Sequence, residues 1–223
     1  MLNSSIIEEI KEWFKIEKSL GDSKDSQANV AEKVGVAILP TKTTEPRVGT
    51  KNEPYKTFRK AAVLVPIVGT NEELFIPLMK RTDTGGLHSG QISFPGGKRE
   101  IGDKNAVETA LRETKEEYGW DPRSVNVLGC LDDELTPTGY VVRPVIAHVP
   151  KAMEYQPDDK EVASIFHLPM EFLLDHKNEC RLEPVSYEGR LYKIFEYRYD
   201  GHRIWGLTAR ILNKIARIAR KKG

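Results

Sequence analysis

The stretch GGKREIGDKNAVETALRETKEEYGW, residues 96–120, decides the fold and most of the chemistry. Its end, RETKEEYG, spaces Glu113, Glu116 and Glu117 so that a helix carries all three on the same side. Carboxylates this close repel one another, and a hard divalent cation such as Mg²⁺ is the natural counter-charge because it prefers oxygen ligands. The alternative for an isolated glutamate-rich helix is a solvated charged face.

The glycines upstream of the helix favour the metal site over the solvated face. Residues 92–94 predict a short strand, which Pro95-Gly96-Gly97 ends, so that a polar loop follows. Asp103 is expected to cap the helix, and Gly119 to end it in the left-handed conformation. In this strand, glycine loop and helix, backbone carbonyls of the loop are expected to join the carboxylates around a metal.

This pattern resembles the Nudix box, G-x5-E-x7-R-E-U-x-E-E-x-G-U, in which U is an aliphatic residue. The matching positions are Gly97, Arg112, Glu113, Glu116, Glu117, Gly119 and Trp120. Two features depart from the pattern. The interval before Arg112 is one residue longer, with Asp103 in place of the first glutamate, and Thr114 stands where an aliphatic residue is usual. Both departures leave the spacing of the acidic cluster intact.

The flanking segments are similar to the coenzyme A pyrophosphatase branch of that family. Residues 78–97, LMKRTDTGGLHSGQISFPGG, resemble its second signature, and IWGLTA at 204–209 resembles its C-terminal segment. One position differs, because Gly85-Gly86 stand where the branch has Leu-Arg, so a cation expected beside substrate phosphates is absent. The cations that could substitute are Lys80, Lys98, Arg99 and Arg143.

The resemblance implies an α/β protein, the Nudix α/β/α sandwich with a mixed sheet, and a metal-dependent diphosphatase that uses Mg²⁺ or Mn²⁺. Its substrate would be coenzyme A or acyl-coenzyme A, cleaved to 3′,5′-ADP and (acyl) 4′-phosphopantetheine. ADP-ribose or another dinucleotide stays open as the substrate, because Gly85-Gly86 replace the expected Leu-Arg. A catalytically silent Nudix-fold binding protein is the third interpretation.

The same resemblance assigns roles to individual residues. The implied metal ligands are Glu113, Glu116, Glu117 and the carbonyl of Gly97. Arg112 is expected to orient the glutamates by ion pairing. The general base is expected to be Glu161, since a mobile loop can carry a carboxylate to the attacking water, with Glu113 as the alternative. The implied substrate-binding residues are Arg81, His88, Gln91, Phe94, Lys98 and Thr136.

Composition fits a single soluble enzyme. The chain has 223 residues and a net charge of +1, which gives no general attraction to nucleic acid or to an anionic membrane. Cys130 and Cys180 form no metal-binding pattern, and no segment has the length and apolarity of a membrane span or signal peptide. We therefore expect a cytoplasmic protein with a small nucleotide as its partner, and the aromatic N-terminal helix permits a homodimer.

Two regions are expected along the chain. Residues 1–58 form a helix at 5–20, with Ser5 and Glu8 as a capping box, and a polar extended segment, which together are part of the domain or packed on it. Residues 59–223 form the Nudix hydrolase domain. Its expected elements are strands at 61–68, 74–79, 125–131 and 141–149, a hairpin at 181–199 and a helix at 207–222 that packs its apolar stripe on the sheet.

Overall fold

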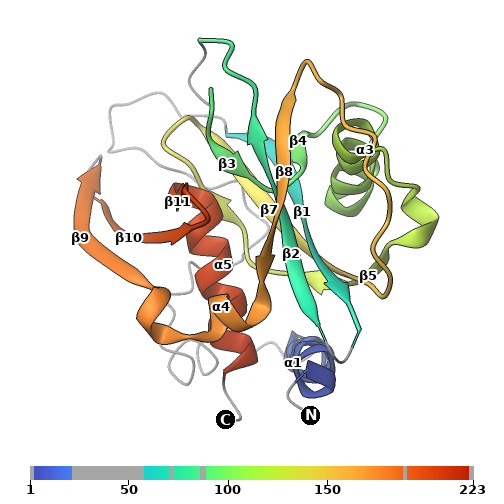
Figure 1. Ribbon diagram of the computed structural model, residues 1–223, viewed down its shortest axis with the longest axis vertical. Helices are drawn as coiled ribbons and strands as arrows, with labels where there is room; N and C mark the ends of the chain where they lie inside the picture. Colours follow the sequence, from blue (N-terminus) through green and yellow to red (C-terminus); the bar gives the residue numbers. More distant parts are fainter. Residues whose placement is uncertain (1–2, 22–57, 71–72, 86–88, 188–189, 221–223) are drawn as a thin grey trace.

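A computed structural model describes residues 3–21, 58–70, 73–85, 89–187 and 190–220 (Figure 1). The helices are α1 (Asn3–Gly21), α3 (Ala106–Tyr118), α4 (Met170–Leu174) and α5 (Gly206–Ala219), with 3-10 turns at Pro122–Ser124 and His176–Asn178. The strands are β1 (Arg59–Gly69), β2 (Leu74–Arg81), β3 (Ile92–Ser93), β4 (Gly96–Lys98), β5 (Asn126–Cys130), β6 (Glu134–Leu135), β7 (Tyr140–Val149), β8 (Val162–Pro169), β9 (Cys180–Tyr187), β10 (Arg190–Tyr199) and β11 (His202–Trp205).

The larger sheet is mixed, as predicted. β1 runs parallel to β7 along nearly its whole length, from the pair Arg59–Tyr140 to the pair Val68–Val149. The other pairings are antiparallel: β1 with β2 and β4, β2 with β3 and β8, and β7 with β5 and β6. A second, antiparallel sheet has the order β11-β10-β9.

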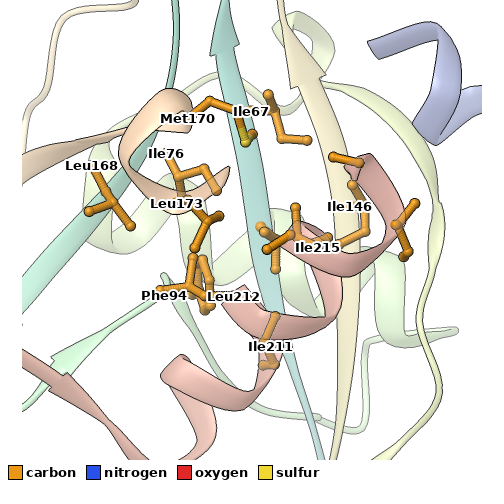
Figure 2. Packing of buried hydrophobic residues seen from close by; sticks show 14 of the residues in the cluster. Ile67, Ile76, Phe94, Ile146, Leu168, Met170, Leu173, Ile211, Leu212 and Ile215 are labelled. Carbon is orange, nitrogen blue, oxygen red and sulfur yellow. The ribbon is translucent and has the colours of Figure 1, made fainter. Parts of the chain in front are cut away.

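Alternate residues of β1 face two separate apolar layers. Leu64 and Val68 pack with Ala110 and Tyr118 of α3 on one face. Val65 and Ile67 face the other layer, which contains the apolar stripe of α5 and residues of α4 (Figure 2). The side-chain period of two in a strand explains this division, and burial of each large aliphatic side chain contributes about 1.5–3 kcal/mol. The α/β class and the layered arrangement with helices on both faces are confirmed.

The N-terminal helix α1 lies on the α5 side of the large sheet. Ile6, Ile7 and Ile10 are buried in the same layer as α5. The ring of Phe14 covers β5 so closely that a Cβ on Gly129 would lie 2.4 Å from it. The apolar stripe of this helix therefore packs on the chain's own core rather than facing solvent.

Several elements differ locally from the prediction. The helix α3 is capped by Asn105, whose side chain accepts a hydrogen bond from the backbone N–H of Glu108, and not by Asp103. The helix α1 begins at Asn3, so the predicted capping box at Ser5 is not at its start. The predicted hairpin at 181–199 is confirmed by β9 and β10, although its turn at 188–189 lies outside the described residues, as does most of the predicted extended segment. None of the described helices is long and apolar enough to cross a membrane.

Candidate active site

Gly96 and Gly97 lie on a segment that crosses between two diverging strands. β1 and β2 pair directly only near Val68, and where they separate β3 pairs with β2 and β4 pairs with β1. A Cβ on Gly96 would lie 2.4 Å from the carbonyl oxygen of Ala62 in β1, so only glycine fits at this position. The prediction that Pro95-Gly96-Gly97 only ends a strand is therefore wrong, because Gly96–Lys98 form a strand of the sheet; the predicted polar loop follows this strand at residues 99–105.

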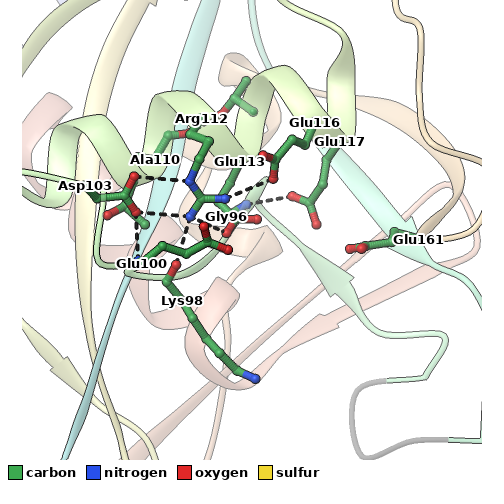
Figure 3. A network of polar contacts seen from close by, with 12 residues as sticks. Gly96, Lys98, Glu100, Asp103, Ala110, Arg112, Glu113, Glu116, Glu117 and Glu161 are labelled. Carbon is green, nitrogen blue, oxygen red and sulfur yellow. Dashed lines mark hydrogen bonds and ion pairs between the residues drawn. The ribbon is translucent and has the colours of Figure 1, made fainter.

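Each of these glycines contacts one glutamate of α3. A Cβ on Gly97 would lie 2.6 Å from the carboxyl carbon of Glu113, so the missing side chain provides the space that this carboxylate occupies. The backbone N–H of Gly96 donates a hydrogen bond of 2.7 Å to Oε2 of Glu117 (Figure 3). The glycine pair thus fixes the positions of two carboxylates against the edge of β4.

Arg112 joins the acidic residues around it. Its Nε and Nη2 donate to the two carboxylate oxygens of Asp103 at 3.1 Å, and Nη2 also donates to the carbonyl oxygen of Lys98 at 3.0 Å. The same guanidinium lies 2.9 Å from Glu113 and 3.0 Å from Glu116. The hydrogen bonds from Arg112 lower the pKa of Asp103 to about 2. Asp103, at the box position usually held by glutamate, therefore holds this arginine in place instead of capping the helix.

Burial raises the pKa values of two box glutamates. The side chain of Glu117 is 3% exposed, and desolvation raises its pKa to about 7, against the opposing effects of the Gly96 hydrogen bond and of Arg81. Burial also raises the pKa of Glu113, where Arg112 opposes the shift. Glu116 is different, because its side chain is 57% exposed. The site therefore concentrates negative charge in a region that disfavours it.

Glu161 approaches the same cluster from the start of β8. Its carboxylate points toward Glu117 in Figure 3. Arg81 bridges the two carboxylates, with Nη1 at 3.1 Å from Glu117 and Nη2 at 3.2 Å from Glu161. The carbonyl of Glu161 accepts a hydrogen bond from the N–H of Thr82, and the hydroxyl of Thr82 donates to the carbonyl of Lys160. The predicted mobile loop at Glu161 is instead anchored by these hydrogen bonds to the end of β2.

The predicted metal ligands do not converge on one point in this structure. Glu113 and Glu116 are turned toward Arg112, and Glu117 is turned toward Gly96 and Arg81. Within the described part of the chain, no three Asp, Glu, His or Cys side chains are grouped closely enough to hold a metal ion. The donor set still fits a hard divalent cation, because it consists of carboxylate and carbonyl oxygens. Burial of the Glu113 and Glu117 carboxylates also makes a nearby positive charge favourable. A cation bound here would replace arginine contacts.

The predicted substrate-binding residues fall into different environments. Lys98 is exposed on β4, Gln91 is partly buried before β3, and the carbonyl of Gln91 accepts the backbone N–H of Arg81. Phe94 is 2% exposed and packs in the apolar layer beneath α5, so we do not retain it as a substrate contact. The hydroxyl of Thr136 accepts the N–H of Tyr140 in the β6–β7 turn. His88 lies outside the described residues.

Two of the four substitute cations are already engaged. Arg99 donates to the carbonyl oxygens of Asp103 and Lys104, and Arg143 is ion-paired with Asp133. Lys80 and Lys98 both extend exposed side chains. The two lysines are therefore the better candidates for the missing cation at Gly85-Gly86.

Sequence reasoning missed the double pairing of Arg81. It identified Arg81 only as a substrate-binding residue, whereas the structure places its guanidinium between Glu117 and Glu161. A shift in pairing register between β2 and β8 at Lys80 and Arg81 brings these groups together. No local pattern in the sequence signals such a shift, because it depends on strands separated by about 80 positions.

Comparison with known proteins places the chain among Nudix proteins. A profile of the NUDIX domain matches residues 58–185. An uncharacterized Nudix hydrolase, NudL, of Photorhabdus laumondii is 37% identical over 158 residues, which cover 71% of this chain and 83% of the relative. NudL of Yersinia pestis is 36% identical over 160 residues, which cover 72% of this chain and 79% of the relative.

Similarity to solved structures is more distant. The Nudix hydrolase RenU from M. smegmatis aligns with a TM-score of 0.45 and 18% identity, over 52% of this chain and 74% of its own. That likeness carries no argument about substrate. The domain profile and the sequence relatives carry the family assignment.

Proposed function

The chain belongs to the Nudix hydrolase family, and we propose on this premise that its substrate is coenzyme A or an acyl-coenzyme A. The family acts on phosphoanhydride bonds, so the enzyme hydrolyses the diphosphate of a nucleoside diphosphate-linked substrate. The products of coenzyme A cleavage are 3′,5′-ADP and 4′-phosphopantetheine, which retains any acyl group.

One contact carries the choice of coenzyme A. The hydroxyl of Thr208, in the IWGLTA segment, donates a hydrogen bond of 2.9 Å to the carbonyl oxygen of Ile92, in the segment of residues 78–97. The strand β11 also packs beside β3. The two segments that resemble the coenzyme A branch are therefore one structural unit next to the acidic site, although more than 100 residues separate them. This arrangement supports a substrate role for both.

Nudix hydrolases generally use divalent metal ions, and we assign Mg²⁺ or Mn²⁺ to Glu113, Glu116, Glu117 and the carbonyl of Gly97. When bound, such an ion neutralises diphosphate oxygens and lowers the pKa of a water molecule. Arg112 keeps the glutamates of α3 in place through its contacts with Asp103 and Lys98. The rigid anchoring matters because small displacements of reacting groups cost large factors in rate.

We assign the general base to Glu161. Its side chain is 53% exposed, and the one hydrogen bond described for it, from Arg81, goes to Oε2, so Oε1 faces no described donor. An oxygen without a described donor supports the proposal that Glu161 accepts the proton of the attacking water. Glu113 is the alternative, but its carboxylate is held between Arg112 and Gly97.

A substrate panel tests this proposal. Purified protein with Mn²⁺ is incubated with coenzyme A, acetyl-coenzyme A, ADP-ribose and NADH, and kcat/KM is measured from separated products. We expect coenzyme A or its acetyl form to have the highest value. A higher value for ADP-ribose would overturn the coenzyme A assignment, and lack of turnover of any substrate would favour a binding protein.

A single substitution tests the base. Glu161→Gln keeps the shape and the contact with Arg81 but cannot accept a proton, so we expect kcat to fall by about 100-fold or more. The matched control is Glu171→Gln, an exposed glutamate in α4, which should leave kcat unchanged. An unchanged rate for Glu161→Gln would return the role to Glu113.

A further inference from the structure

Two arginines divide the four glutamates of the site into two pairs. Arg112 contacts Glu113 and Glu116, and Arg81 contacts Glu117 and Glu161. The arginines differ in their surroundings, because Arg112 is also bound to Asp103 and to a backbone carbonyl. The described contacts of the Arg81 guanidinium are to these two glutamates only. Arg81 is therefore the cation that is less firmly held.

The guanidinium of Arg81 binds the second carboxylate oxygen of Glu117. Oε2 of Glu117 accepts the N–H of Gly96, and Oε1 accepts Nη1 of Arg81 at 3.1 Å. Because Oε2 is bound to Gly96, Oε1 is the oxygen left for a second cation, and Arg81 already contacts it. Two positive charges in that space repel each other, so Arg81 and a metal ion exclude one another at this oxygen.

The backbone around Arg81 is fixed, so only its side chain can move. The N–H of Arg81 donates to the carbonyl of Gln91, and the N–H of the next residue, Thr82, donates to the carbonyl of Glu161. The Arg81 side chain is 28% exposed, which leaves room on its solvent side. Release of Glu117 therefore does not require the strand to shift.

We infer that Arg81 is the resident counterion of the metal-free site and that a divalent cation displaces it from Glu117. The displaced Nη1 then faces the diphosphate, while Nη2 keeps Glu161 beside the site. Arg81 thereby acts as a positioning residue that couples metal binding to substrate binding. The inference rests on the proposed metal-dependent function, but its test measures metal binding without any substrate.

The test compares Mn²⁺ affinity in the wild type and in Arg81→Gln by isothermal titration calorimetry at pH 8.5. Removal of the competing cation should tighten binding roughly three- to tenfold, the range expected for loss of one partly exposed charge-assisted pair. The matched control is Arg220→Gln, which also removes an arginine–glutamate pair, with Glu179, at the C-terminal end of α5. Its Mn²⁺ affinity should equal that of the wild type. Equal or weaker binding by Arg81→Gln would overturn the inference.

A measurement on the wild-type protein does not depend on a variant that folds. The side-chain ¹⁵N–¹H signals of Arg81 should show restricted Nη rotation without metal, because both ends of the fork are bound. Addition of Mg²⁺ should restore rotation at Nη1, and unchanged signals would contradict displacement. If Mn²⁺ binding behaves as expected but coenzyme A is not cleaved, the proposed substrate is wrong and the counterion role of Arg81 stands.

Discussion

Replacement of Glu117 by glutamine should stabilise the metal-free protein at alkaline pH. The buried Glu117 carboxyl has a pKa of about 7 in the fold, compared with 4.5 for an ordinary glutamate. The folded state therefore binds a proton more tightly than the unfolded state, and the free energy of unfolding falls as pH rises from 4.5 through 7. Glutamine has a similar shape, keeps the N–H contact with Gly96 in reach and carries no charge to desolvate.

The difference in pKa sets the size of the effect. At pH well above 7 the raised pKa lowers the free energy of unfolding of the wild type by about 3 kcal/mol, and below pH 4.5 it lowers it by almost nothing. Urea unfolding in EDTA, for wild type and Glu117→Gln at pH 4.5, 6, 7 and 8.5, measures this directly. We expect the variant's advantage to grow across that series, reaching a value of order 2–3 kcal/mol.

A constant difference between the two proteins across the pH range, or a less stable variant at pH 8.5, would contradict the raised pKa of Glu117. Addition of Mn²⁺ provides the complementary readout. The ion should raise the stability of the wild type increasingly as pH rises, because binding displaces a proton, and should have little effect on Glu117→Gln.

Four other substitutions test the construction of the site and the domain. Gly97→Ala should fold normally but lose activity by roughly 100-fold, since its Cβ meets only the flexible end of Glu113. Gly96→Ala should lose about 2 kcal/mol or more of stability, because its Cβ meets the backbone of β1. Denaturation and turnover assays on both variants check this, and like outcomes for the two would contradict it. Asp103→Asn should lower the free energy of unfolding by about 1.5–3 kcal/mol at pH 7, because it removes the carboxylate that accepts hydrogen bonds from Arg112. This loss should shrink as pH falls toward 2, where the wild-type carboxyl is protonated. Ile10→Ala should lower the free energy of unfolding by about 2–5 kcal/mol, and the variant should unfold in one cooperative transition if α1 belongs to the domain. A separate early transition in urea would place α1 outside the domain.

The helix and its end could be predicted from local rules. Gly119 ends α3 in the left-handed conformation, with φ 74° and its N–H on the carbonyl of Lys115, as its position after the periodic segment indicates. The alternation of buried residues in β1 likewise follows from side-chain period. Such features depend on neighbours within a few positions, which the sequence displays directly.

The parts that were mispredicted depend on partners far along the chain. Pro95-Gly96-Gly97 has the composition of a turn, yet β1 diverges from β2 and offers a free edge with which these residues pair. Asp103 has the composition of a helix cap, yet the guanidinium of Arg112 and the cap at Asn105 give it another role. Local preference is a weak constraint where a distant strand or ion supplies the better partner.

The bridge from Glu117 through Arg81 to Glu161 is the clearest example of such dependence. Three residues spread over 80 positions meet because β2 pairs with β8 and slips by one position at its end. Their types and the family resemblance predicted a site that contains them. Their geometry required the fold.

Hydrolysis of coenzyme A should depend on the acidic residues of α3. Mass analysis of the products from coenzyme A and Mn²⁺, with wild type and Glu117→Gln at equal concentration, tests it most directly. We predict equal amounts of 3′,5′-ADP and 4′-phosphopantetheine from the wild type and neither product from the variant. Intact coenzyme A after incubation with the wild type, or equal cleavage by both proteins, would contradict the claim.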